Sequence, residues 1–117
     1  MHYKVMRNII RHACEQCGVP ELSEENQIVI AFFDGFAGTL ADAELISGRG
    51  FIRLCARTWP SMSHRQQVEL LIHEACHVIA DYRYGHYKKY TSHGPHWRLL
   101  MRCAGVPDPR SSIDLRH

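Results

Sequence analysis

The residues best suited to chemistry form the sequence H-E-A-C-H at positions 73–77. Because His73 and His77 are four residues apart, a helix would place both imidazole rings on one face. Two imidazoles at this spacing can bind a single metal ion at the usual Zn–N distance of about 2.0–2.1 Å. Glu74 would then lie beside the ion, where its carboxylate could take a proton from a zinc-bound water. The cluster therefore predicts a hydrolytic metal centre with Glu74 as the general base.

This H-E-x-x-H spacing is the pattern of zinc metalloproteases. The alternative is an ordinary core helix that carries two hydrogen-bonded histidines and binds no metal. Three features of the sequence favour the metal site. The motif lies inside an apolar stretch, a helix start is well marked upstream, and a second histidine group follows downstream.

A catalytic zinc also needs a third protein ligand and one open position. No glutamate follows Glu74, so a downstream Glu is excluded as that ligand. The extended pattern H-E-x-x-H-x-x-G-x-x-H fails as well, because Ala80 and Arg83 stand where glycine and histidine are needed. The remaining candidates are Asp81, His86, His93 and His96. We favour His93, which precedes the next expected helix after a loop long enough to fold back.

Local signals predict an α+β domain built from six elements. Apolar periodicity predicts a helix at 3–17, and β-branched runs with turn residues predict strands at 27–33, 38–46 and 50–58. A second helix is expected from Ser63 to about Tyr82 or Tyr84. The last helix is opened by Gly94-Pro95 and closed by Gly105-Val106-Pro107. Ser63 and Gln66 match a capping box, which marks the start of the helix that carries the motif. The alternating apolar and polar residues at 50–58 indicate a half-exposed strand. We therefore expect a short antiparallel sheet of about three strands.

Composition limits the class of protein. A length of 117 residues with no shift in composition suits one domain, residues 1–117. The chain has no apolar leader and no uninterrupted apolar stretch of 18 residues, so we expect a cytoplasmic protein without a membrane partner. The odd number of scattered cysteines indicates reduced, mostly buried thiols: Cys14, Cys17, Cys55, Cys76 and Cys103. No second cysteine pair completes a four-thiolate site with the C-x-x-C at 14–17, so both of its cysteines are expected in the core.

The two histidine motifs together resemble those of the SprT family of zinc metallopeptidase domains. Members of that family carry H-E-x-x-H on one helix and a third histidine in an H-G-x-x-[F/W] motif that opens the next helix, which matches H-G-P-H-W at 93–97. Three further segments resemble the family, so that the match spans about residues 28–110: Ala37-Gly38-Thr39, Phe51-Ile52-Arg53-Leu54, and Gly105-Val106-Pro107 with Arg110. The resemblance implies a small zincin-like domain in which His73, His77 and His93 bind Zn²⁺ and Glu74 is the catalytic base. We expect a minimal form, without the C-terminal zinc ribbon of many bacterial relatives.

These observations favour a zinc-dependent metalloprotease that hydrolyses peptide bonds in a protein substrate. The strand at 50–58 is a candidate edge that could pair with an extended substrate, although it could equally be an ordinary sheet strand. One alternative is a non-catalytic binding module that zinc stabilises, which would need a fourth ligand such as His96, Asp81 or a cysteine.

The other alternative is a protein associated with nucleic acid, or a protease that acts on DNA-bound proteins. Its sequence support is a set of basic residues with two tyrosines that could stack on bases: Arg49, Arg53, Arg57, Lys88, Lys89, Arg98 and Arg102, with Tyr87 and Tyr90. At a net charge of +2, composition does not indicate a nucleic-acid binder, and scattered surface charge is the simpler interpretation.

Overall fold

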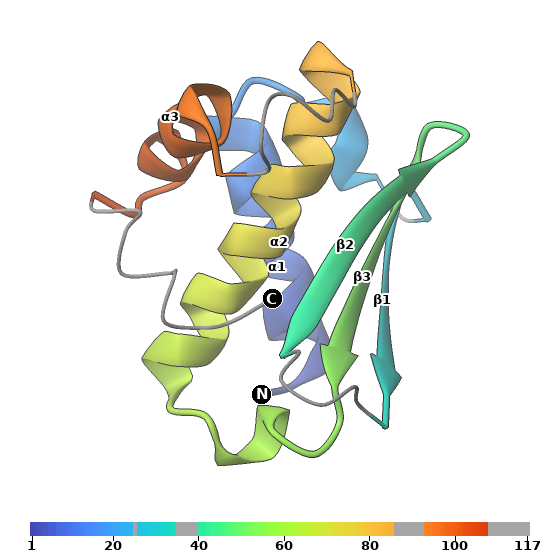
Figure 1. The fold of residues 1–117 in the computed structure, drawn as a ribbon, viewed down its shortest axis with the longest axis vertical. Helices are drawn as coiled ribbons and strands as arrows, with labels where there is room; N and C mark the ends of the chain where they lie inside the picture. Colours follow the sequence, from blue (N-terminus) through green and yellow to red (C-terminus); the bar gives the residue numbers. More distant parts are fainter. Residues whose placement is uncertain (25, 35–39, 86–92, 108–117) are drawn as a thin grey trace.

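The computed structural model describes residues 1–24, 26–34, 40–85 and 93–107. These residues form three α-helices and a three-stranded sheet. Figure 1 shows the helices packed on the sheet, so the predicted α+β class is confirmed. In chain order the elements are α1 (Tyr3–Gln16), a short 3-10 turn (Pro20–Ser23), β1 (Ile28–Phe33), β2 (Ala41–Ile46), β3 (Arg49–Cys55), a second 3-10 turn (Trp59–Ser61), α2 (His64–Tyr84) and α3 (Pro95–Cys103). The first two residues of the strand expected at 38–46 lie outside the described residues, as do His86 and Arg110.

The sheet is mixed, with the strand order β1-β3-β2. β2 and β3 are antiparallel, as expected, and Ser47 and Gly48 at their turn both have positive φ, which is the requirement of a type I′ hairpin. The expectation of a wholly antiparallel sheet is wrong for β1, which runs parallel to β3. The tight hairpin reverses the chain beside β2 and sends β3 back in the direction of β1. β3 is therefore the central strand, and the expectation that it forms an edge is wrong.

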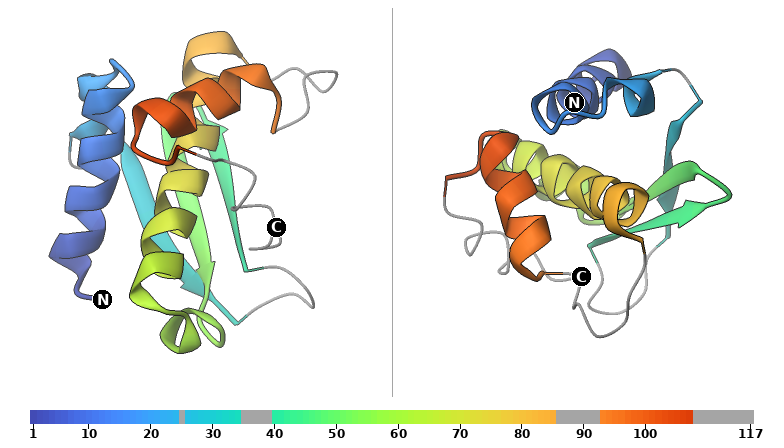
Figure 2. Two further views of the ribbon diagram at one scale, coloured as in Figure 1. Left: turned by 90° about the vertical axis from the view of Figure 1, so that its left-hand side faces the viewer. Right: turned by 90° about the horizontal axis from the view of Figure 1, so that it is seen from above.

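α2 packs against all the other layers. Figure 2 shows α2 between the sheet and α3, and α1 runs along a further side of α2. The buried face of the sheet supplies Ala41, Ile52 and Leu54, all fully buried. The three helices supply much of the rest of the core: Met6, Ile10 and Ala13 of α1, Leu70, Leu71, Ala75, Val78 and Ile79 of α2, and Trp97, Leu100 and Met101 of α3. A helix enclosed in this way carries few exposed positions in its middle.

The ends of the helices follow the predicted signals. Ser63 accepts a hydrogen bond from the Gln66 amide, and the Gln66 side chain accepts one from the Ser63 amide, which completes the capping box. α2 ends before Gly85, whose φ is 79°. α3 begins at Pro95, whose missing N–H costs nothing in the first turn. It ends before Gly105 at φ 104°, where the amides of Gly105 and Val106 close the last turn.

All five cysteines are free thiols, and Cys103 alone is exposed. The expectation of buried thiols is therefore confirmed for four of them. Burial raises the pKa of Cys14 to about 12. The Cys17 thiol donates to the carbonyl of Leu100 at 3.3 Å and so joins the end of α1 to α3. None of the described helices has the length and apolar composition needed to cross a membrane.

Gly50 shows how closely β3 lies on α2. A Cβ atom at this position would stand 2.6 Å from Cγ1 of Val78 and 3.2 Å from Cγ1 of Ile28. Overpacking of a core costs about 1–3 kcal/mol, which exceeds the roughly 0.5–1 kcal/mol that alanine gains over glycine inside a strand. We expect Gly50→Ala to lower the free energy of unfolding in urea by about 1–2 kcal/mol. In a Val78→Ala background the same change should lower the free energy of unfolding hardly at all. If Gly50→Ala alone raises the free energy of unfolding, this packing is wrong.

Candidate metal centre

His73, Glu74 and His77 lie near the middle of the 21-residue helix α2. His73 and Glu74 are fully buried, whereas His77 is partly exposed. The ring centroids of the two histidines are 4.9 Å apart, as expected for side chains one turn apart on a helix. The enclosed position of α2 therefore puts an ionisable group and two potential metal ligands inside the apolar core.

His93 joins this pair from the chain just before α3. Its Nε2 atom lies 3.1 Å from Nε2 of His73, and its ring centroid is 5.1 Å from that of His77. Potential ligand atoms of all three histidines lie within 4.8 Å of one another. Two nitrogens bound at 2.0–2.1 Å to one tetrahedral ion would be about 3.3–3.4 Å apart, close to the separation seen here. The three imidazoles therefore fit a metal ion.

The protonation of His93 also suits a metal ligand. Partial burial lowers its pKa, and the positive charge of Arg98 lowers it further. A neutral imidazole keeps a lone pair available for an ion at neutral pH, because metal binding requires the deprotonated nitrogen.

Two of the other candidates for a third ligand, His96 and Asp81, do not join this cluster. His96 lies on the exposed side of α3, where its ring stacks on that of Tyr84 at a centroid distance of 4.0 Å. Among the residues that the structure describes, the group with metal-ligand geometry consists of the three histidines, and neither His96 nor Asp81 is part of it. His86 cannot be compared, because it lies outside the described ranges.

Glu74 has an unusual electrostatic environment. Burial raises its pKa well above the ordinary value, and the negative charge of Asp42 on β2 raises it further. Asp42 itself accepts two hydrogen bonds of 2.7 Å from Arg53, one at each carboxylate oxygen. A cation bound at the histidines would act in the opposite direction and favour the ionised form of Glu74.

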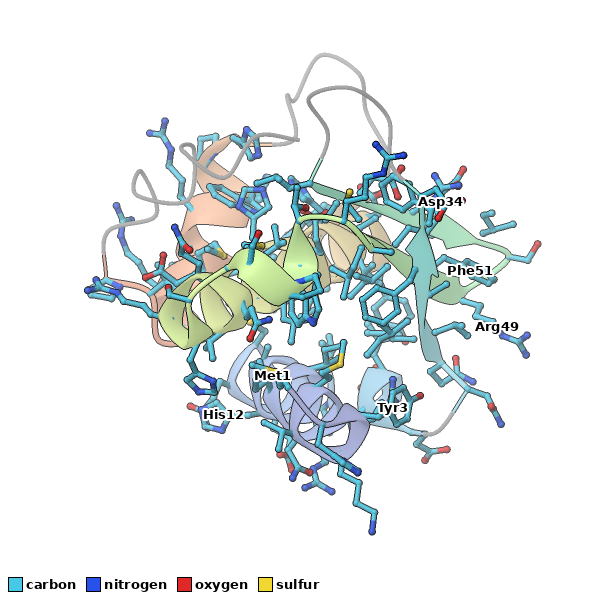
Figure 3. All side chains as sticks on the ribbon, turned by 90° about the horizontal axis from the view of Figure 1, so that it is seen from below. Met1, Tyr3, His12, Asp34, Arg49 and Phe51 are labelled. Atoms are coloured by element: carbon cyan, nitrogen blue, oxygen red, sulfur yellow. The ribbon has the colours of Figure 1, made fainter. Side chains whose placement is uncertain are left out.

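The basic residues expected from the sequence are dispersed over the described surface. Arg53 is paired with Asp42. Figure 3 shows Arg49 at the side of the sheet that is remote from α3, which carries the exposed Arg98 and Arg102. The two tyrosines and two lysines of the predicted basic set lie outside the described residues: Tyr87, Lys88, Lys89 and Tyr90. Association with DNA therefore stays a prediction.

Sequence reasoning missed one residue of the centre, Trp97. From the sequence it was identified only as the last residue of the H-G-P-H-W motif, with no contact to the site, but its ring lies against all three histidine rings. Its spacing of four residues from His93 is a signal that could have suggested this contact.

The fold and the site together define a class of protein. A helix with two histidines and a glutamate, a third histidine before the next helix, and a small sheet packed on the first helix are the features of a zincin-like metal-binding domain. The SprT-like family model matches residues 16–117, nearly the whole chain. The chain therefore belongs to the SprT-like family. No curated protein and no solved structure matches its sequence.

The cluster predicts which side chains control metal affinity. We expect the protein to bind about one divalent ion per chain and His93→Ala to weaken binding by more than about 100-fold, because loss of a ligand should exceed the 10–100-fold effect of outer-shell changes. Asp81→Ala should change the affinity little. Competition with a chromophoric chelator measures both. If Asp81→Ala loses the ion while His93→Ala retains it, the ligand set is wrong.

The raised pKa of Glu74 predicts how the stability of the metal-free protein depends on pH. Between the ordinary value of 4.5 and the raised value, the folded state holds a proton that the unfolded state has released. The stability of the metal-free protein should therefore fall as pH rises through this window. Glu74→Gln removes the titration. The melting temperature of this variant should therefore rise relative to that of the wild type as the pH is raised from 5 to 8. Glu44→Gln, at an exposed position of β2, is the control, and a pH-independent difference for Glu74→Gln would contradict the expectation.

Proposed function

We propose that the protein is a zinc-dependent metallopeptidase in which His73, His77 and His93 hold the ion and Glu74 is the general base. The observation that carries this proposal is the approach of His93, from outside α2, to within 3.1 Å of His73. Membership of the SprT-like family supports the proposal. The two histidine motifs of this chain resemble those of the zinc metallopeptidase domains in that family.

The donor set favours zinc over the harder divalent cations. Three imidazoles suit Zn²⁺, whereas Mg²⁺ and Ca²⁺ prefer oxygen ligands. Three protein ligands also leave a tetrahedral ion one open position, as in catalytic rather than structural zinc sites. A zinc ion held by these three histidines would supply a water of lowered pKa, about 7, and would polarise a carbonyl oxygen.

Glu74 has the properties of a residue that moves protons in this reaction. Its carboxylate would accept a proton from the attacking water and later donate it to the nitrogen of the leaving amine. Burial supports this role, because it raises the pKa of the Glu74 carboxyl group and so makes its carboxylate a stronger base. Within α2 its backbone is fixed by the helix, and its neighbours His73 and Ala75 are fully buried.

We propose an extended protein segment as the substrate. β2 is at an edge of the sheet and packs against α2, and the negative charge of its Asp42 acts on Glu74. An extended chain could add to that edge by main-chain hydrogen bonds, which place few demands on its sequence. The five free thiols support a reducing compartment such as the cytoplasm.

Substitution of the base separates an enzyme from a zinc-stabilised binding module. Glu74→Gln removes the proton acceptor and no ligand, so zinc content should be retained while cleavage of an unfolded protein substrate falls by about 10²–10⁴-fold. Zinc analysis and the rate of substrate cleavage measure the two effects on the same preparation. Glu44→Gln is the matched control. Full activity of Glu74→Gln would rule out this role, and a zinc-loaded wild type that cleaves nothing would favour the binding module.

A further inference from the structure

Trp97 lies in the first turn of α3 and is 2% exposed. The centroid of its ring system is 4.8 Å from that of His73, 5.6 Å from that of His77 and 4.6 Å from that of His93. The His77 ring is nearly parallel to the indole, at 19°, whereas the other two rings meet it at steep angles. One indole therefore forms a shared wall for all three imidazoles.

A hydrogen bond fixes the indole to α2 at the level of the site. The Nε1–H group of Trp97 donates to the backbone carbonyl of His73 at 3.3 Å. Buried tryptophan normally needs a partner for this group, and here the partner belongs to a residue of the histidine pair. The contact ties the start of α3 to the middle of α2.

The backbone between Trp97 and His93 has little freedom. Gly94 is the N-cap of α3 and Pro95 occupies the first turn, where its ring fixes φ near −65°. Because Trp97 is anchored on α2, the short segment between Trp97 and His93 also restricts where the His93 side chain can approach the other two histidines. His93 itself is outside any helix and lies next to the residues that the structure does not describe.

We propose that Trp97 is a positioning residue that holds His93 in the geometry needed to bind the metal ion. The proposal rests on the metal centre proposed above. A ligand that is already in place loses less conformational entropy on binding, so removal of its support should weaken metal affinity without removal of a ligand. The fold supplies the anchor from α2, where the other two histidines lie.

A second tryptophan provides a matched control for ordinary core packing. Trp59 is 5% exposed, and its ring meets that of Phe32 at 6.3 Å. Its carbonyl accepts a hydrogen bond from the Gln67 side chain at the first turns of α2. Truncation of either tryptophan removes a large buried side chain, but Trp59 precedes α2 and lies two turns or more from the histidine pair along the chain.

The test is a double-mutant cycle on zinc affinity, measured by competition with a chelator. Trp97→Leu should weaken zinc binding by about 10–100-fold, the size expected for a group that orients a ligand. In a His93→Ala background, the same substitution should change the remaining affinity by less than about 3-fold, because the side chain that it positions is absent. Trp59→Leu should lower the melting temperature yet change zinc affinity by less than about 3-fold in both backgrounds.

Trp97→Phe keeps an aromatic ring and removes the N–H donor, so we expect an intermediate loss of affinity. It also carries the test if Trp97→Leu does not fold. The absorption spectrum of bound Co²⁺ should change in both Trp97 variants and stay unchanged in Trp59→Leu, since it reports the coordination geometry. Equal losses of affinity with and without His93, or equal losses for the two tryptophans, would overturn the positioning role. If the wild type binds no zinc, the proposed metal centre is wrong as well. This outcome distinguishes failure of the metal centre from failure of the positioning role alone.

Discussion

The enclosure of α2 by the sheet, α1 and α3 is the constraint on which the rest of the structure depends. It brings β3 so close to the helix that position 50 has no room for a Cβ atom beside Val78. It also leaves His73 and Glu74 with no exposed surface. Burial of such groups is costly unless hydrogen bonds, opposite charges or a metal ion compensate them. The same packing that stabilises the domain therefore places a titratable carboxyl group and a potential metal ligand in its interior.

The buried carboxyl group of Glu74 would couple stability to metal binding. Without a cation, the buried carboxyl group of Glu74 is favoured in its neutral form, and the charge of Asp42 strengthens this preference. A divalent ion at the histidines would favour the carboxylate and would stabilise the folded state by a free energy that grows with the logarithm of its affinity. Arg53 contributes at a distance, because its two hydrogen bonds to Asp42 hold the acidic side chain on the strand next to α2.

Much of the fold could be predicted from local signals. The capping box at Ser63 and the glycine at position 85 gave the helix that carries the motif nearly its full length. The direction of β1 could not be predicted, since alternating residues reveal which face of a strand is buried but not which strand lies beside it. The pairing of Arg53 with Asp42 and the contact of Trp97 with His73 were also missed, because each joins residues whose separation in sequence carries no periodic pattern.

Helix geometry explains why the third histidine has to come from another element. His73 and His77 are one turn apart, but Asp81 is eight residues from His73, which corresponds to a rise of about 12 Å. Ligands of one zinc ion must have donor atoms within about 3–4 Å of one another, so a single straight helix cannot supply three at this spacing. His93 meets the condition because α3 docks on α2 and brings its first turn to the histidine pair. In the proposed metal centre, the motif on α2 would therefore supply two ligands, and the packing of α3 would decide whether the site is complete.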